Sequence, residues 1–207
     1  TWALMLTGRV LEDGEGGITL GAEGYVFQSP QLALVAMTLT QAAEWEWPED
    51  IRYLAMTPIS HSAGIKIYTV ILKGGWARMH DGFDKEAFCR IVQDDRITAT
   101  FLVPTTITTL LENRALCERH DLSSLKLIIY GAAPMSPDRL REATDLFGPV
   151  FLQLYGQSEA PECITTLRKA DHDLSRPERL SSCGRPTSFC EVKLLDANLN
   201  EVPVGEP

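Results

Sequence analysis

The sequence has few basic residues and no long hydrophobic run. Among its 207 residues, 19 are Lys or Arg and 28 are Asp or Glu, which gives a formal net charge of −9. Non-specific binding to DNA, RNA or anionic membranes depends on clustered Lys and Arg, so this balance argues against a nucleic-acid partner. No apolar run reaches the ~18 residues that cross a bilayer, and we therefore expect no transmembrane segment.

The sequence also lacks a cysteine pattern typical of a metal site or a disulfide framework. Its five cysteines are odd in number, no two are spaced C-x-x-C, and no histidine stands at zinc-finger spacing. We interpret them as buried or free thiols in a reducing, cytoplasmic environment. With 44% hydrophobic residues, a chain of this length can bury roughly 70% of its unfolded surface without disulfides or a structural metal.

Short apolar runs alternate with amphipathic stretches along most of the chain. The runs predict buried strands, and the amphipathic stretches predict helices. The predicted strands are Arg52–Thr57, Ala99–Val103, Leu125–Tyr130, Val150–Tyr155 and Glu191–Leu195, and the predicted helices begin near Gln31, Ala63, Lys85, Thr105 and Ser136. This alternation predicts an α/β fold, a mostly parallel sheet flanked by helices. Two stretches, Glu12–Gly24 and Arg168–Ser182, are expected to be irregular loops.

The loops after the predicted strands form the candidate site, because parallel sheets bind ligands at the carboxyl ends of their strands. Tyr130–Pro134 contains small residues that would let an adenine ring lie against the backbone. In the loop after the next strand, Tyr155 suits stacking on a base, Ser158 suits donation to a phosphate oxygen, and Glu159 suits Mg²⁺. Each loop also has a purely structural alternative, a tight turn in which Gly and Pro serve geometry alone.

The four histidines differ in their surroundings. His61 stands between a predicted strand and a predicted helix, where it would either line a pocket or hydrogen-bond at the helix start. His80, His120 and His172 each adjoin an acidic residue, and we expect all three at the surface.

Several segments carry motifs in a characteristic order, namely Pro58–Gly64, Phe101–Thr105, Gly131–Pro134, Tyr155–Glu159 and Cys183–Pro186. In this order the chain resembles the adenylate-forming (AMP-binding) superfamily of acyl-CoA synthetases, luciferase-like enzymes and peptide-synthetase adenylation domains. The most diagnostic match is Tyr155–Glu159, which resembles Y-G-x-T-E with Ser in place of Thr. The resemblance runs from about Leu32 to the end, and Gln157–Pro161 is most similar to fatty-acyl and aryl-acyl CoA ligases.

This resemblance implies roles for individual residues. Ser158 and Glu159 would be catalytic, with Ser158 on a phosphate and Glu159 on Mg²⁺. His61 would border the acyl pocket. Tyr155 would stack on the adenine that the small residues after the preceding strand contact. The implied nucleotide-binding residues are Gly131, Ala132, Ala133, Pro134, Tyr155, Gly156, Gln157 and Ser158.

The implied activity is that of an ATP-dependent acid–thiol ligase, which activates a carboxylic acid as an acyl-adenylate and transfers it to CoA. Its cofactors and co-substrates would be ATP, Mg²⁺ and CoA. The family's upstream phosphate loop corresponds to Gly16–Gly24, where Glu23 replaces the family's Lys. A carboxylate repels a triphosphate, so we assign no phosphate binding to that stretch.

The implied organisation is a piece of a longer protein. Residues 1–30 would be an N-terminal segment with the degenerate glycine-rich loop, and residues 31–207 the central part of an adenylate-forming N-terminal domain. The C-terminal domain with its catalytic Lys would be absent, so this chain alone is expected to be inactive or nearly so. Its oligomeric state stays open, a homo-oligomer included.

Two alternatives remain. Gly156–Ala160 is close to the G-x-S-x-G elbow of α/β-hydrolases, with Ser158 as nucleophile and Asp171 or Asp173 and His172 as its partners. Adjacent residues such as Asp171 and His172 rarely adopt the geometry of a triad. The other alternative is a non-catalytic module that binds an acid or a nucleotide, which Glu23 at the lysine position favours.

Overall fold

The computed structural model describes residues 30–156, 162–196, 198, 200–203 and 205, together with the backbone of four short strands before residue 30. Side chains are described from Leu34 onward. The four strands are β1 (Leu4–Met5), β2 (Arg9–Glu12), β3 (Ile18–Ala22) and β4 (Tyr25–Val26).

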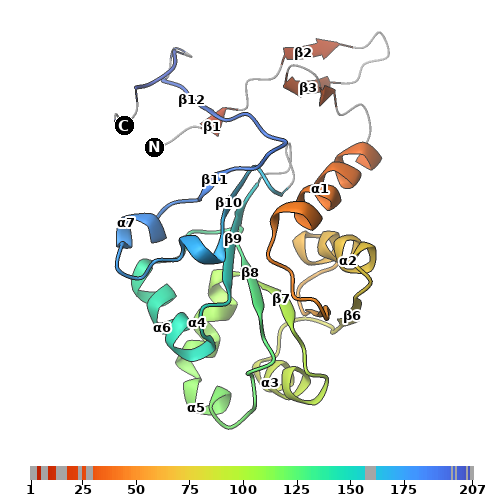
Figure 1. Ribbon diagram of the computed structural model, residues 1–207, viewed down its shortest axis with the longest axis vertical. Helices are drawn as coiled ribbons and strands as arrows, with labels where there is room; N and C mark the ends of the chain where they lie inside the picture. The colour runs from red at the N-terminus through yellow and green to blue at the C-terminus, as the bar shows by residue number, and fades with distance from the viewer. Residues whose placement is uncertain are drawn as a thin grey trace.

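A seven-stranded sheet forms the centre of the molecule, in the order β11-β10-β9-β8-β7-β5-β6 (Figure 1). Its strands are β5 (Arg52–Ala55), β6 (Trp76–Met79), β7 (Ala99–Leu102), β8 (Leu127–Tyr130), β9 (Phe151–Tyr155), β10 (Thr165–Leu167) and β11 (Arg185–Pro186). Strands β5 to β9 run parallel, whereas β10 and β11 add an antiparallel edge. The predicted mostly parallel sheet flanked by helices is confirmed.

Helices cover both faces of this sheet (Figure 1). On one face lie α1 (Pro30–Glu44) and α2 (Ser62–Leu72), and on the other lie α3 (Lys85–Asp94), α4 (Pro104–Glu112), α5 (Arg114–Cys117) and α6 (Pro137–Phe147). Successive residues of a strand point to opposite faces. Accordingly, Tyr53 and Ala55 pack in the layer with α2, whereas Leu54 packs with α3 and α6.

Helix α6 shows how local sequence sets an element's limits. The Ser136 side chain accepts a hydrogen bond from the Arg139 backbone N–H at 3.3 Å, and Pro137 occupies the first helical position. Leu140 and Ala143 are buried on one face, and Gly148 ends the helix with φ 84°. The predicted helix at Ser136 is confirmed.

Two stretches that were expected to be irregular contain regular structure, and one predicted strand is shorter than expected. Within Glu12–Gly24, β3 pairs antiparallel with β2 to form a hairpin; residues 13–17, 23 and 24 lie outside the described part. Ile18 and Leu20 alternate with smaller residues, as in a strand. The surrounding glycines, which are typical of loops, hide this pattern in the sequence. Arg168–Ser182 contains a 3₁₀ turn (Lys169–Asp171) and helix α7 (Pro177–Leu180). The last predicted strand shortens to β12 (Lys193–Leu194), which pairs with β1 instead of joining the central sheet.

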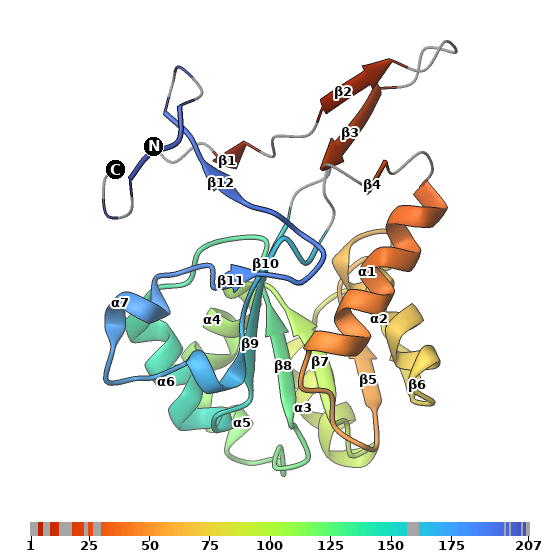
Figure 2. The same ribbon diagram turned by 45° about the horizontal axis from the view of Figure 1, so that its top comes forward.

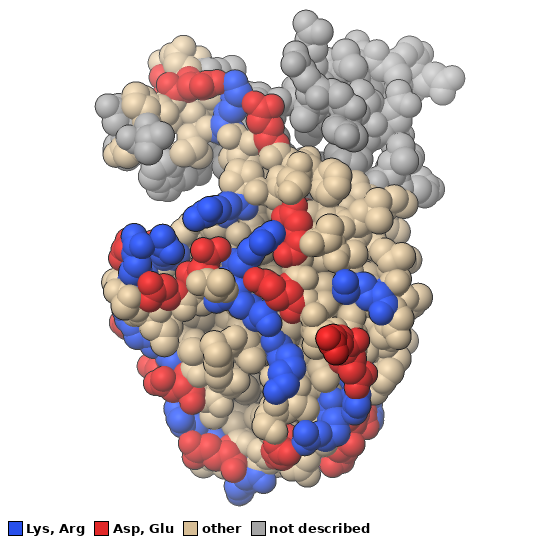
Figure 3. Space-filling model, viewed as in Figure 1, with Lys and Arg blue, Asp and Glu red and all other residues tan. Residues whose placement is uncertain are grey.

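The outer surface of α1, α2 and β6 is rich in exposed apolar side chains. These are Val35, Leu39, Tyr68, Ile71, Leu72, Trp76 and Met79. Exposed apolar groups in such numbers are typical of surfaces that contact a protein, a membrane or a ligand. Elsewhere, on the face that Figure 3 shows, basic and acidic side chains are interspersed rather than gathered by sign. Within the described residues, no helix is long and apolar enough to cross a membrane.

Candidate functional site

The carboxyl ends of β8 and β9 lie side by side, because the two strands are parallel neighbours. They lie at the end of the sheet toward which the arrows of β7 and β8 point in Figure 2. Tyr130 pairs with Gln153 in the parallel register, so the next residue, Gly131, lies beside the end of β9. Gly131 is buried, and a Cβ at this position would come 2.6 Å from the Leu154 carbonyl oxygen. The loop after β8 therefore needs glycine here, and it lies against the residue that precedes Tyr155.

Three small side chains follow Gly131 at this edge. Ala132, Ala133 and Pro134 are all exposed. Ala132 has φ 68°, in the left-handed region, which costs an L-residue roughly 1–2 kcal/mol. Strain of this kind gathers at functional sites. Three exposed small residues thus follow a glycine that lies against Leu154, the neighbour of Tyr155. Their role in nucleotide binding stays a prediction.

The loop after β9 is closed at its base by a close backbone contact. A Cβ on Gly156 would lie 2.5 Å from the Glu162 nitrogen and 2.6 Å from its Cα. Tyr155 and Gly156 are both partly exposed. Gln157, Ser158 and Glu159 lie outside the described residues, so their implied roles stay predictions.

His61 is exposed at the N-terminal end of α2, in the loop that follows β5. Its backbone N–H donates to the Pro58 carbonyl at 3.0 Å, but its side chain makes no capping hydrogen bond. The structure thus gives no support to the helix-start role. A place beside an acyl pocket stays a prediction for His61.

A buried ion pair, which sequence reasoning missed, joins α2 to the segment after β9. The Lys66 Nζ lies 2.7 Å from Glu162 Oε1, with side-chain exposures of 0% and 5%. Burial lowers the pKa of Lys66, and the charge and hydrogen bond of Glu162 oppose that shift. One feature of the sequence could have indicated this pair: Lys66 is the only charged residue in α2.

His172 is half-buried against Tyr130, which corrects the expectation of a surface residue. Its Nε2 lies 3.1 Å from the Tyr130 hydroxyl, and its Nδ1 lies 2.8 Å from the Arg168 carbonyl oxygen. A carbonyl can only accept, so Nδ1 carries the proton and the neutral ring accepts the Tyr130 hydroxyl at Nε2. Both ring nitrogens are thus engaged, and neither is hydrogen-bonded to Asp171 or Asp173. The arrangement does not support the Asp–His pairing of the hydrolase alternative.

The remaining two histidines are also half-buried rather than fully at the surface. His80 Nδ1 lies 3.0 Å from the Gly82 carbonyl oxygen. His120 Nδ1 lies 2.9 Å from the Leu116 carbonyl oxygen. Each ring therefore serves local backbone structure.

The burial of His172 predicts an acid-sensitive stability. Burial lowers the pKa of His172 below its ordinary value of 6.5, so the unfolded chain takes up the proton at a higher pH than the folded one. The stability gained from neutral His172 is present above pH 6.5 and is lost as the pH falls through the folded pKa. We expect urea unfolding of this chain to show a smaller loss of stability between pH 7.5 and 5.5 in His172→Gln than in the unsubstituted chain. A His80→Gln control should keep the original loss, and an unchanged loss in His172→Gln would contradict the assignment.

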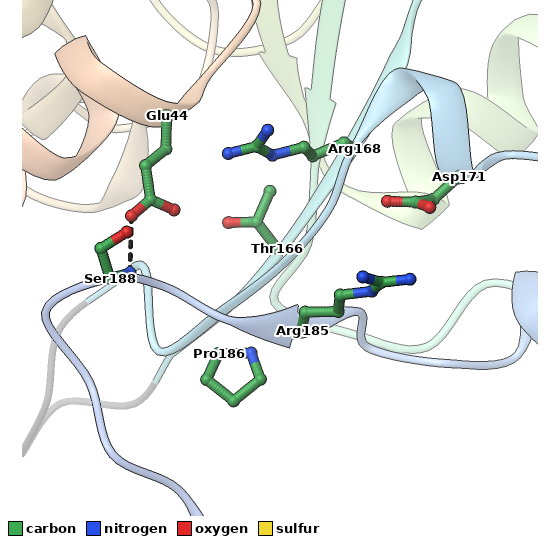
Figure 4. Close-up of a pocket in the computed structure, with 7 residues that line it drawn as sticks. All are labelled: Glu44, Thr166, Arg168, Asp171, Arg185, Pro186 and Ser188. Atoms are coloured by element: carbon green, nitrogen blue, oxygen red, sulfur yellow. Dashed lines mark hydrogen bonds between the residues drawn. The ribbon is translucent and has the colours of Figure 1, made fainter.

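A cavity of about 260 Å³ lies where the end of α1 meets β10 and β11 (Figure 4). The Ser188 backbone N–H donates to Glu44 Oε1 at 2.6 Å. Two arginines, Arg168 and Arg185, balance two carboxylates in its lining. The lining residues are Glu44, Thr166, Arg168, Asp171, Arg185, Pro186 and Ser188. None of the site residues that the family resemblance implies is among them, although Asp171 was a candidate of the hydrolase alternative.

The described residues offer no ready-made metal centre. Among them, no group of three or more His, Cys, Asp or Glu side chains is placed to hold a metal ion. All five cysteines are free thiols, as expected. The magnesium prediction therefore depends on Glu159, outside the described part.

Comparison with known proteins supports the relationship that the motifs suggest. Residues 28–207 match the family model of AMP-binding enzymes. A medium/long-chain-fatty-acid–CoA ligase of Mycobacterium tuberculosis is 45% identical over 191 residues, which cover 92% of this chain and 32% of that protein.

Solved structures agree with this match. The amide bond synthetase McbA from Marinactinospora thermotolerans superimposes with a TM-score of 0.77 at 29% identity, over 92% of this chain and 36% of that one. The O-succinylbenzoate coenzyme A synthetase of Bacillus subtilis, in complex with ATP and magnesium, has the same fold at a TM-score of 0.68 and 21% identity, over 84% of this chain and 35% of that one. The chain spans about a third of the length of the relatives that it matches. The parallel sheet, the adjoining ends of β8 and β9, and these matches together show that the chain belongs to the AMP-binding, adenylate-forming enzyme family.

Proposed function

We propose that the protein containing this chain is an ATP-dependent acid–thiol ligase that acts on medium- or long-chain fatty acids. The observation that carries the proposal is the 45% identity with a medium/long-chain-fatty-acid–CoA ligase across 92% of the chain. The adjoining ends of β8 and β9 support it, because Gly131 in the implied adenine segment lies against Leu154, which precedes Tyr155. The free thiols fit a reducing cytoplasm.

The chain itself is proposed to be the central part of the enzyme's N-terminal domain. Residues 31–207 would supply the nucleotide surface and one wall of the acid site, and residues 1–30 would form the preceding segment. The catalytic Lys that the family carries in its C-terminal domain would come from another part of the protein. The isolated chain is therefore expected to bind ligands more readily than it turns them over.

The exposed surface at Ala132–Pro134 fits a purine, since small side chains let a flat ring approach the backbone. Tyr155 would close on the ring from the end of β9. Ser158 would donate to a phosphate oxygen. Glu159 is proposed to hold Mg²⁺, whose charge would offset that of the phosphates.

The proposed reaction has two halves. In the first, a carboxylate oxygen of the acid attacks the α-phosphorus of ATP, the bond to the leaving pyrophosphate breaks, and an acyl-adenylate forms. In the second, the thiol sulfur of CoA attacks the acyl carbon, AMP leaves, and a thioester forms. The chain's own residues contribute positioning and charge to the first half. His61 would border the acyl chain.

The test is ATP–pyrophosphate exchange by the full-length protein with a panel of acids. We expect exchange with medium- or long-chain fatty acids, and thioester formation when CoA is added. An amine acceptor should be included, because one structural neighbour is an amide bond synthetase. Amide formation without thioester would overturn the thiol assignment, and the absence of exchange with every acid would overturn the ligase proposal. Nucleotide binding without exchange would favour the non-catalytic module, and labelling of Ser158 by a fluorophosphonate would favour the hydrolase.

A further inference from the structure

Four buried polar side chains form a hydrogen-bonded network between α1, α2 and the segment after β9. Lys66 Nζ donates to Glu162 Oε1 at 2.7 Å, and Gln41 Nε2 donates to Glu162 Oε2 at 2.8 Å. The Thr69 hydroxyl donates to Gln41 Oε1 at 2.9 Å. Gln41, Lys66 and Thr69 are fully buried, and Glu162 is 8% exposed. Both carboxylate oxygens of Glu162 therefore have donors supplied by two different helices.

Two aromatic rings also lie near the Lys66 ammonium group. Its Nζ lies 4.2 Å from the ring centroid of Phe101 and 5.7 Å from that of Trp45. A buried ion pair of this kind is no more stabilising than well-packed apolar residues of the same volume. Its best-attested use is to fix one arrangement among several, because displaced partners would each be left as an unpaired charge.

The ion pair joins two parts of the proposed site, the start of α2 and the segment that follows the loop after β9. Lys66 Nζ also donates to the Ser62 carbonyl at 2.9 Å, beside His61 at the start of α2. Glu162 is the first described residue after positions 157–161, and its backbone lies against Gly156. Glu162 and Cys163 have φ 47° and 63°, in the left-handed region that L-residues rarely adopt. Contacts with the surrounding structure are needed to keep the backbone in this conformation.

We propose that Lys66 is a positioning residue, which through Glu162 holds the end of the nucleotide loop in register with the acid-side end of α2. This inference rests on the proposed ligase function. Gln41 assists by fixing the second oxygen of Glu162, and Thr69 fixes Gln41. The pair thereby sets the distance between the bound acid and the α-phosphorus that it attacks. Small displacements of reacting groups cost large factors in rate.

The test uses the full-length protein with the network replaced by apolar residues of similar size, Gln41→Leu/Lys66→Met/Glu162→Met. No buried charge is left unpaired, and the Thr69 hydroxyl keeps the Thr38 carbonyl as an acceptor at 3.4 Å. We expect the melting temperature to stay close to that of the wild type. The kcat for acyl-adenylate formation should fall by roughly ten- to a hundredfold, while titration of active sites gives an unchanged number. The KM for ATP should change much less than kcat.

Two further variants keep the test decisive. Arg114→Met/Glu118→Met removes an exposed ion pair on the far side of the sheet and should leave kcat unchanged. If the triple variant does not fold, Glu162→Gln decides, because it keeps the size of the side chain and an acceptor for Lys66. Its kcat should fall at least roughly fivefold with the number of active sites unchanged.

The outcomes separate the two proposals. A folded triple variant with the kcat of the wild type, or a loss of kcat that matches the loss of active sites, would overturn the positioning role alone. So would an unchanged kcat in Glu162→Gln. A wild-type protein that activates no acid would overturn the ligase proposal and this inference with it.

Discussion

Replacing Glu159 by Gln in the full-length protein is expected to lower the rate of acyl-adenylate formation by roughly 10²–10³-fold. The substitution keeps the size of the side chain and removes the negative charge that is proposed to hold Mg²⁺ against the phosphates. Loss of one such electrostatic contact at a reacting centre typically costs a factor of this size. ATP–pyrophosphate exchange measured over a range of Mg²⁺ concentrations checks the prediction, and the variant should need more Mg²⁺ for half-maximal rate.

A matched substitution separates the role of Glu159 from a general effect of lost charge. Glu142→Gln on α6 removes a carboxylate that is paired with Arg139 at the surface. We expect that variant to exchange pyrophosphate at the wild-type rate. An unchanged rate and Mg²⁺ dependence in Glu159→Gln would instead show that this residue does not hold the metal.

The single substitution Lys66→Met is expected to destabilise the fold by about 3–5 kcal/mol. Among the described residues, it leaves the buried Glu162 carboxylate with Gln41 as its one side-chain donor, and an unpaired buried charge carries a penalty of this order. Glu162→Met should be similarly destabilising, since it strands the Lys66 ammonium group. Urea unfolding of the chain at pH 7 measures both effects.

The same experiment contains its own control. Combining the two substitutions with Gln41→Leu should restore most of the lost stability, because no charge or amide is then left unpaired. Arg114→Met, which breaks an exposed pair, should have little effect. If Lys66→Met proved no more destabilising than Arg114→Met, the buried pair would have no role in stability.

The sequence predicted those strands and helices whose residues follow a local hydrophobic pattern. The parallel strands β5, β7, β8 and β9 are near-continuous apolar runs, because both of their faces are buried. Strand β6 has no such run: it lies at the edge, and Trp76, Arg78 and Met79 are exposed. Local patterns carry little information about an edge of this kind. Strands β10 and β11 are three and two residues long, and they depend on pairing with distant parts of the chain.

The candidate site likewise has features that the sequence predicted and features that it could not predict. That Gly131 lies next to Leu154 followed from parallel strands having their carboxyl ends at one edge. The pairing of Lys66 with Glu162 could not be anticipated, because it joins residues 96 positions apart. The same holds for the cavity between Glu44 and Arg185, whose lining comes from α1, β10, the 3₁₀ turn and β11. His172 adjoins acidic residues in the sequence, yet its nearest ring partner is Tyr130 on another element.

The most direct test of the account is a crystal structure of the full-length protein with Mg²⁺ and a non-hydrolysable ATP analogue. The account predicts that the adenine lies within about 4 Å of Ala132–Pro134 and of the Tyr155 ring. It also predicts that Glu159 reaches the metal. A nucleotide seated instead in the cavity of Glu44, Arg168 and Arg185, away from the ends of β8 and β9, would contradict it.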